Sequence, residues 1–240
     1  MPRKETVIVT GASQGIGAAI VHAFLDRGYH VVATSRSVSK SGVTPSSSLA
    51  LVDGDIGQTA TAAKVAQVAV ATFGSIDHVI NNAGIFTAKP FTDYTEDEFR
   101  RLVSTNLEGF VFITQLAVKQ MLSQGAGGSV TTITAALADN PTAGSPASIA
   151  MMTKGGLDTI TLSLANEYAK DHIRFNAVAP GVVDSPLVKD TPRELLKSRS
   201  PMGTITDPKD IAEAVVYLTE AGHITGEVLH VDDGAHVGRW

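Results

Sequence analysis

The sequence predicts an α/β fold in which one doubly wound, mostly parallel sheet carries helices on both faces. Strand-like and helix-like patterns alternate along the whole chain, and repeated strand–helix units build parallel sheets that are covered on both sides. A glycine-rich turn separates the first strand pattern from the first helix pattern. The length of 240 residues suits one domain with a sizeable core. We therefore expect a single domain over residues 1–240.

The expected elements follow from local patterns. Residues 7–9 are a β-branched run that indicates a strand, and residues 16–25 place apolar side chains at helical spacing. Gly28 is suited to end that helix. The other expected strands are 30–34, 49–52, 76–80, 129–133, 175–178 and 228–231, and the other expected helices are 59–73, 95–122, 148–169 and 208–218.

Helix caps and loops complete this outline. Thr95 and Glu98 form a capping-box pattern at the start of the long helix, and Ser148 has the residue type of an N-cap. Residues 37–48 are polar and rich in serine, which is typical of a loop. Residues 184–206 hold three prolines and little periodicity, so we expect an excursion above the sheet. Ligands of doubly wound folds bind beyond the carboxyl ends of the strands.

Composition limits the classes of partner and compartment. The net charge is −5 and no cluster of Lys and Arg stands out, so nucleic acid is not an expected partner. The chain has no cysteine, which excludes disulfides and thiolate metal sites and fits a reducing compartment. No apolar run approaches the length of about 18 residues that a membrane span needs. We expect a cytoplasmic protein without a membrane or metal partner.

The glycine-rich turn is the first candidate binding site. Gly11 allows a tight turn, Gly15 lets the backbone approach a diphosphate, and Gly17 allows close packing of the helix that follows. The amino end of that helix offers free N–H groups and a favourable dipole to phosphate. The alternative is a purely structural turn. The residues expected to contact the cofactor here are Gly11, Ser13, Gln14, Gly15, Ile16 and Gly17.

The segment from Thr10 to Gly17, T-G-A-S-Q-G-I-G, resembles the signature of the short-chain dehydrogenase/reductase family. Further motifs resemble that family in the same order along the chain, and their spread makes chance agreement improbable. The resemblance implies a Rossmann fold and a nicotinamide dinucleotide cofactor. The positions that it assigns to cofactor contacts are Asp55, Ile56, Asn82, Ala83, Gly84, Lys154, Pro180, Gly181, Val183 and Ser185, and it assigns Asn106 and Lys154 to the catalytic set.

The end of the second expected strand bears on the choice between NAD and NADP. An acidic residue there would hold the ribose hydroxyls of NAD, whereas a basic residue would pair with the 2′-phosphate of NADP. The chain has Ser35, Arg36 and Ser37 at this point and no acid. We therefore expect NADP(H) rather than NAD(H). The alternative is that Arg36 is an ordinary solvated loop residue, and Gln14 weakens the NADP case because many NADP-using relatives have a basic residue there.

The resemblance also implies two losses at the catalytic centre. The family places a tyrosine four residues before its lysine and a serine after the fifth strand, and both contact the reacting oxygen. This chain has Ala150 four residues before Lys154, and Ala135 aligns best with the serine. Neither alanine can donate a proton. Asp139 is the acid in the same loop and is a candidate substitute, and Tyr94 is a weaker one.

Two classes of function follow. The first is an NADP(H)-dependent oxidoreductase acting on a small carbonyl, imine or activated alkene, with a non-standard or impaired proton donor. The second is a catalytically inactive NADP(H)-binding protein with a sensor or regulatory role, or a disabled variant of a carbonyl reductase. The resemblance further implies a homodimer or homotetramer formed through the two long helices.

Overall fold

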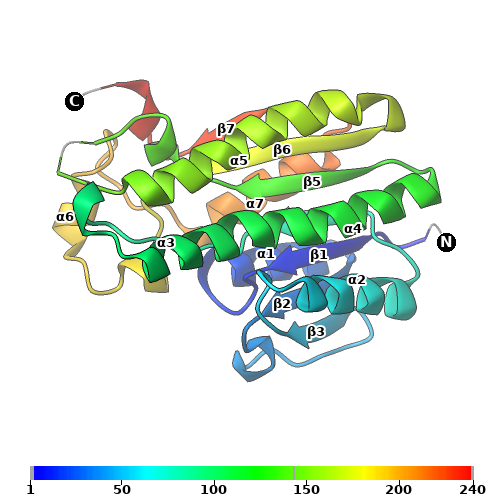
Figure 1. Ribbon diagram of the computed structural model, residues 1–240. Helices are drawn as coiled ribbons and strands as arrows, with labels where there is room; N and C mark the ends of the chain where they lie inside the picture. Colours follow the sequence, from blue (N-terminus) through cyan, green and yellow to red (C-terminus); the bar gives the residue numbers. More distant parts are fainter. Residues whose placement is uncertain (1–2, 143, 239–240) are drawn as a thin grey trace.

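The computed structural model describes residues 3–142 and 144–238 and contains a seven-stranded parallel sheet (Figure 1). The strand order is β3-β2-β1-β4-β5-β6-β7, so successive strands are added on one side of β1 up to β3 and on its other side from β4 onward. The expected fold class is confirmed. The strands are β1 (Thr6–Thr10), β2 (His30–Ser35), β3 (Leu49–Asp53), β4 (His78–Asn81), β5 (Gly128–Ile133), β6 (Ile173–Pro180) and β7 (Val228–Val231).

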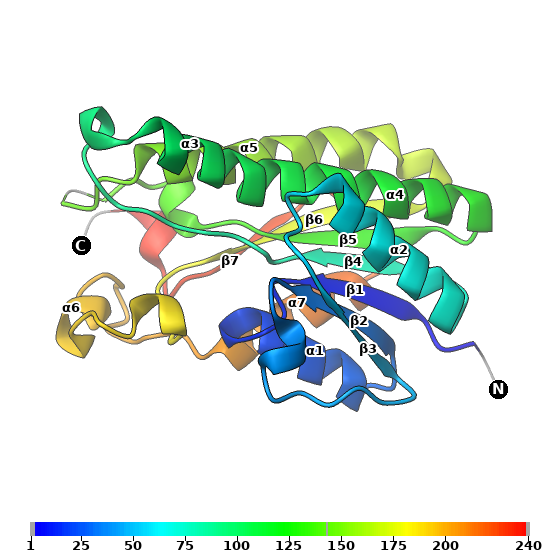
Figure 2. The same ribbon diagram turned by 60° about the horizontal axis from the view of Figure 1, so that its bottom comes forward.

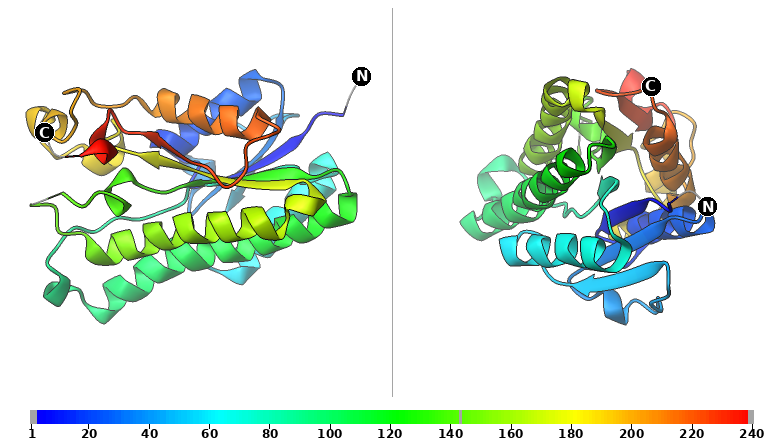
Figure 3. Two further views of the ribbon diagram at one scale, coloured as in Figure 1. Left: turned by 90° about the horizontal axis from the view of Figure 1, so that it is seen from above. Right: turned by 90° about the vertical axis from the view of Figure 1, so that its right-hand side faces the viewer.

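Helices cover both faces of the sheet, which Figure 3 shows in two views. One face carries α1 (Gly15–Asp26) and α7 (Pro208–Glu220), and the other carries α2 (Thr59–Phe73), α4 (Gly109–Gln124) and α5 (Ser148–Glu167). Alternate strand residues point to opposite faces, so Val7 and Val9 join the core under α1 and α7, whereas Ile8 joins the other core. Because both faces are covered, all five residues of β1 are buried.

The expected helix over 95–122 is interrupted. The structure has α3 (Glu96–Val103), then a π-helical turn at Ser104–Glu108, and then α4. The Thr95–Glu98 capping box is present at the start of α3. A π-helical turn inserted in a helix is often associated with a functional site, and this one contains Asn106. The prediction that Ser148 caps α5 is wrong, because Ala147 is the N-cap and Ser148 is the first helical residue.

Residues 184–206 project beyond the carboxyl ends of the strands and include α6 (Arg193–Lys197), as Figure 2 shows. The two ends of this excursion meet at a bridge between Val183 and Thr206. The Asp184 amide donates to the Thr206 carbonyl at 2.9 Å. The excursion therefore leaves and rejoins the sheet at one point. Among the described residues, no helix has the length and apolar character to span a membrane.

Candidate active site

The glycine-rich turn lies between β1 and α1 in close contact with the segment after β4. Gly11 has φ +66°, and a Cβ atom there would lie 2.8 Å from both the Ala83 Cα and the Asn82 Nδ2 atoms. A Cβ atom on Gly17 would lie 2.2 Å from the Gly11 carbonyl oxygen. Side chains at these two positions would therefore collide with backbone. The structure thus assigns Gly17 to closure of the turn itself, in addition to the predicted helix packing.

Polar contacts join this turn to the segment after β4. The Asn82 side-chain amide donates to the carbonyl oxygens of Thr10 (2.9 Å) and Gly11 (3.1 Å). The Thr10 hydroxyl in turn accepts from the Asn82 and Ala83 amides at 3.1 and 3.0 Å. Two motifs about 70 residues apart are thereby held as one unit at the switch point of the sheet, where doubly wound folds bind ligands.

The amino end of α1 fits an anionic group. The N-cap residue Gln14 forms no side-chain cap hydrogen bond, and the first turn contains no acidic residue. The first N–H groups of a helix lack intrahelical acceptors and attract negative charge. At Gly15 the absence of a Cβ atom leaves the backbone open, with no other residue closer than 3.4 Å to the Cβ position. These residues fit the diphosphate of a dinucleotide.

The end of β2 carries the predicted adenosine-side residues. Arg36 is exposed, and within the described chain its side chain forms no hydrogen bond or ion pair to another residue. The Ser35 hydroxyl accepts from the Ser37 amide at 3.3 Å. The neighbouring strand β3 ends at Asp53, which is paired in register with Ser35.

Asp53 is a polar neighbour that the motif comparison missed. It accepts from the Ser39 amide at 2.9 Å and also from the Ser39 hydroxyl. These hydrogen bonds hold the pKa of Asp53 below its usual value. Of the two predicted residues nearby, Asp55 accepts from the Gly57 amide at 3.0 Å, and Ile56 is buried in the core.

Asn106 links the π-helical turn to both the β4 loop and α5. Its side-chain oxygen accepts from the Ile85 amide at 2.9 Å, and its side-chain nitrogen donates to the Ile85 carbonyl at 3.1 Å. The same nitrogen donates to the Thr153 hydroxyl at 2.9 Å, which donates to the Ala150 carbonyl at 2.7 Å. A buried amide with its partners satisfied is a rigid element, so Asn106 fixes the start of α5 relative to the loop after β4.

Lys154 projects from α5 toward the carboxyl end of β5. Its ammonium nitrogen donates to the Ile133 carbonyl at 2.7 Å, and burial lowers the pKa of Lys154 to about 8. A Cβ atom on Gly84 would lie 3.2 Å from this nitrogen and 3.4 Å from the Asn106 side-chain oxygen. The structure therefore brings together Gly84, Asn106 and Lys154, three residues that come from distant parts of the sequence.

The two alanines lie beside this group. Ala150 precedes Lys154 by one helical turn, is 1 % exposed, and belongs to a small apolar cluster with Leu102 and Ile149. Its methyl group is thus enclosed by apolar neighbours. Ala135 follows β5 and is half-buried.

The candidate substitute acids have other partners. Asp139 forms an ion pair with His230 at 3.0 Å, and half of its side chain is exposed. Tyr94 packs against the cluster around Ala150, and its hydroxyl donates to the Thr87 carbonyl at 2.6 Å. Burial raises the pKa of Tyr94. In this arrangement neither proton-bearing group is directed at Lys154.

The start of the excursion closes over the glycine-rich turn. The Ser185 Cβ and the Pro186 Cδ atoms would each lie 3.4 Å from a Cβ atom on Gly15. At the end of β6, the Gly181 amide donates to the Val231 carbonyl at 3.1 Å. Of the predicted contacts Pro180, Gly181, Val183 and Ser185, Ser185 therefore lies beside the turn, and Gly181 packs against the end of β7.

A largely apolar cavity of about 540 Å³ adjoins the start of α5. Its walls come from the loop between β5 and α5 and from the first turn of the helix. The lining includes Leu137, Pro141, Pro146 and Met151 and contains no charged residue among those described. Cavities of this size suit a small apolar ligand. The lining includes Ser148 and Met151, which lie within two residues of Ala150 on α5, and this makes the cavity a candidate substrate pocket.

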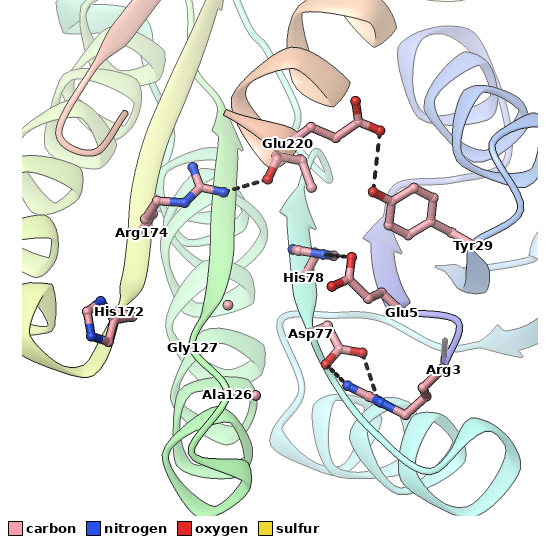
Figure 4. Close-up of a pocket in the computed structure, with 12 residues that line it drawn as sticks. Arg3, Glu5, Tyr29, Asp77, His78, Ala126, Gly127, His172, Arg174 and Glu220 are labelled. Atoms are coloured by element: carbon pink, nitrogen blue, oxygen red, sulfur yellow. Dashed lines mark hydrogen bonds and ion pairs between the residues drawn. The ribbon is translucent and has the colours of Figure 1, made fainter. Parts of the chain in front are cut away.

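A second cavity, of about 380 Å³, lies at the opposite, amino-terminal edge of the sheet (Figure 4). Three pairs of its polar side chains bind one another, and Arg174 donates to backbone carbonyls. The Arg3 guanidinium contacts the Asp77 carboxylate at 2.7 Å, and His78 contacts Glu5 at 3.1 Å. The Tyr29 hydroxyl donates to the Glu220 carboxylate at 3.3 Å in the same view. Because these groups satisfy each other, we interpret this cavity as part of the structure that holds the amino edge together.

Replacement of Asp77 by asparagine is expected to reduce the free energy of unfolding by about 2 kcal/mol at pH 7. Burial disfavours the Asp77 carboxylate, but hydrogen bonds from Arg3, the Thr6 amide and Ser75 outweigh it and hold its pKa below the usual value. A lowered folded-state pKa stabilises the fold above the unfolded pKa of about 3.9, and this stabilisation is lost as the pH falls through the folded value. Urea unfolding of the wild type and of Asp77→Asn at pH 7 and pH 3 measures the loss of stability and its dependence on pH.

The matched control is Glu220→Gln, whose carboxylate lies on the surface of the same cavity. It is expected to change stability by less than about 0.5 kcal/mol. An equal loss of stability for Asp77→Asn at both pH values would contradict the assigned role of the ionised carboxylate.

Comparison with known proteins gives a consistent picture. A family model described as enoyl-(acyl carrier protein) reductase matches residues 11–236. The L-rhamnose 1-dehydrogenase (NAD(P)(+)) of Sphingomonas sp. (strain SKA58) is 34 % identical over 247 residues, which cover 97 % of this chain and 96 % of that protein. The NADP-dependent (R)-specific alcohol dehydrogenase of Lentilactobacillus kefiri is 34 % identical over 245 residues, with 96 % of each chain covered.

Solved structures agree with these relatives. The aldohexose dehydrogenase of Thermoplasma acidophilum, in ligand-free form, superposes with a TM-score of 0.88 and 30 % identity, covering 99 % of this chain and 96 % of that chain. The 3-ketoacyl-(acyl-carrier-protein) reductase of Brucella melitensis, complexed with NADH, gives a TM-score of 0.89 and 26 % identity, covering 98 % and 99 %. The similarity thus extends over almost the whole chain.

Proposed function

Because this chain belongs to the short-chain dehydrogenase/reductase family, we propose that it is an NADP(H)-dependent oxidoreductase with a non-standard or impaired proton donor. Its substrate would be a small carbonyl, imine or activated alkene. One observation carries the proposal. The Lys154 ammonium group, the Asn106 side chain and Gly84 converge on the site that adjoins the glycine-rich turn. A protein that had lost all use of a dinucleotide would have no need of this arrangement.

Different residues of this chain would bind different parts of the cofactor. The amides at the start of α1 would hold the diphosphate, and Lys154 would donate to the nicotinamide ribose. The bound cofactor would supply a hydride, which is chemistry that belongs to the cofactor itself. Ser185 would meet the carboxamide of the nicotinamide. The apolar loop around Leu137 and Met151 would exclude water from the substrate.

The alanines limit the substrates that can react. A positioned general acid contributes about 10²- to 10⁴-fold in rate, and the methyl groups of Ala135 and Ala150 donate no proton. An ordinary ketone, whose oxygen becomes charged as hydride arrives, would be reduced slowly. An iminium ion already carries the positive charge that a proton would provide, so we propose polarised substrates of this kind over simple ketones.

Cofactor preference is the first test of the proposal. The exposed Arg36 guanidinium would form a charge-assisted pair with the 2′-phosphate of NADP. We expect Arg36→Ala to raise the Kd of NADPH by about 10- to 100-fold, since such hydrogen bonds contribute about 1.5–3 kcal/mol. The Kd of NADH should change less than about 2-fold, because NADH lacks that phosphate. Fluorescence titration of both cofactors measures the two constants.

The matched control is Lys40→Ala, which removes an exposed positive charge close to the same loop and should leave the preference for NADPH intact. Equal affinity of wild type and Arg36→Ala for NADPH would refute the role of Arg36. If neither NADPH nor NADH binds saturably to the folded protein, the proposed function itself fails.

The second candidate function is a catalytically inactive NADP(H)-binding protein with a sensor or regulatory role. The presence of alanine at both 135 and 150 favours it. This candidate requires NADPH binding without turnover. Measuring NADPH oxidation with a panel of ketones, imines and enones separates the two, since consumption above background with any of them supports the oxidoreductase.

A further inference from the structure

Asp158 is a buried acid that the proposed function does not use. It lies on the buried face of α5 together with Ala150, Thr153, Leu157 and Thr161. The residue is 9 % exposed, and neither carboxyl oxygen has a hydrogen-bond partner at normal distance and angle among the described residues, although the Thr134 hydroxyl is close enough to lower its pKa. Buried carboxyl groups are almost always hydrogen-bonded, because leaving them unpaired is costly. An exception of this kind calls for a functional explanation.

The sheet beneath Asp158 presents a polar row. Ile133, Val178 and Leu229 are paired in register across β5, β6 and β7 and point into the core under α1 and α7. Since side chains alternate along a strand, the next row, which contains Thr134, Ala179 and His230, faces α5.

The charged groups that face Asp158 come from three elements. Lys154 lies one turn earlier on α5, at the i, i+4 spacing that puts two side chains on one helix face. His230 comes from β7, and Asp139 comes from the loop between β5 and α5, where it pairs with His230 at 3.0 Å. Burial raises the pKa of Asp158 to about 6, and the Asp139 charge adds to this, while Thr134, Lys154 and His230 oppose it.

The pKa of Lys154 depends on burial and on the charge of Asp158. Burial is the main reason why its pKa falls to about 8, and the carboxylate of Asp158 opposes that fall. The Lys154 ammonium hydrogen-bonds to the Ile133 carbonyl rather than to an acid. Asp158 is the acid one turn further along the same helix face. Its charge raises the pKa of Lys154, although Asp158 is outside the predicted cofactor contacts.

We propose that Asp158 is a positioning residue that acts through Lys154, keeping the lysine ammonium charged so that it can hold the nicotinamide ribose of the reduced cofactor. This inference rests on the proposed function. It adds a specific property, which is a pH-dependent affinity for NADPH that a residue without cofactor contacts controls.

The test is the Kd of NADPH measured by fluorescence titration between pH 5.5 and 9.5. For the wild type we expect constant affinity up to about pH 8 and a progressive loss above it, as the lysine loses its charge. For Asp158→Asn we expect the loss to begin roughly one pH unit lower, because an opposite charge on the same helix face raises a lysine pKa by about that amount. At pH 6, where Lys154 is charged in both proteins, the two affinities should agree within about 2-fold.

Two further variants separate this role from a structural one. Asp158→Glu keeps the carboxylate and should restore the wild-type pH profile. Glu167→Gln removes an exposed acid from the far end of the same helix and should also give the wild-type profile. Superimposable curves for wild type and Asp158→Asn would overturn the inference, as would an equal shift for Asp158→Asn and Asp158→Glu.

Titration of Lys154 itself tests the coupling without the cofactor. The ¹³Cε signal of Lys154, assigned with Lys154→Arg, reports the titration of the lysine in the cofactor-free protein. We expect a lower midpoint in Asp158→Asn than in the wild type, and identical midpoints would overturn the inference. If Asp158→Asn does not fold, Asp158→Ser serves instead, and an unchanged lysine midpoint in that variant would overturn the inference. Absence of NADPH binding at every pH would refute the proposed function, whereas the lysine titration would still decide the coupling.

Discussion

Replacement of Ala150 by tyrosine is expected to raise the rate of NADPH-dependent ketone reduction by about 10²- to 10⁴-fold, which is the usual contribution of a positioned general acid. Position 150 lies one helical turn before Lys154, and i, i+4 side chains share a helix face. The lysine charge would stabilise a phenolate at this distance and lower the phenol pKa. The new hydroxyl would then supply the proton that the alanine methyl cannot.

The geometry imposes one condition on this gain. Ala150 is 1 % exposed and packs against Leu102 and Ile149, so the tyrosine ring must turn away from this cluster toward the adjoining cavity. Overpacking of a buried site costs about 1–3 kcal/mol, which thermal unfolding will reveal. Steady-state kinetics with a simple ketone should therefore be read together with the melting temperature.

The control for this prediction is Ala150→Phe, which adds the same ring without a hydroxyl. A comparable gain for phenylalanine would show that ring size, and not proton donation, causes the effect. Adding Ala135→Ser to Ala150→Tyr should increase the rate further, because a second hydroxyl would bind the same oxygen. If the double variant binds NADPH and is folded but gains no ketone activity, the site has diverged beyond the two alanines.

Much of the fold follows from local patterns that need no tertiary information. Short apolar runs identified all seven strands, and their ends differ by at most two residues from those in the structure. The π-helical turn at Ser104–Glu108 was missed because helical apolar spacing continues on both sides of it, and one added residue is too local a change to end the pattern. The Ser148 cap was predicted from residue type alone, whereas the backbone places Ala147 at that position.

Some residues of the candidate site can be predicted from sequence motifs, and others cannot. Gly11, Gly17 and Asn82 belong to contiguous motifs, so their roles follow from sequence signatures whose contacts the structure then displays. Asp158 belongs to no motif used in the prediction, and its importance depends on a register that joins Thr134 to His230 across β6. Groups of this kind come from different strands, and only the pairing of those strands reveals that they are neighbours.

Replacement of Gly17 by alanine is the most direct test of the cofactor site, and we expect it to raise the Kd of NADPH by about 100-fold. The added methyl group would lie 2.2 Å from the Gly11 carbonyl oxygen and 2.5 Å from the Asn82 side-chain nitrogen. Neither atom is free to move, since Asn82 also holds the Thr10 carbonyl at 2.9 Å. Relief of the collision must therefore displace the turn from the amino end of α1.

Helix propensity makes this expectation specific, because alanine in a helix is favoured over glycine by about 1 kcal/mol. Gly17 lies within α1 and does not have a positive φ, so the substitution would stabilise the protein if only the local backbone mattered. The matched control is Gly156→Ala on α5, where no atom lies within 4 Å of the added Cβ; it should keep NADPH affinity and not lower the melting temperature. Wild-type affinity in Gly17→Ala would mean that contact between Gly17 and the turn is not what shapes the diphosphate site.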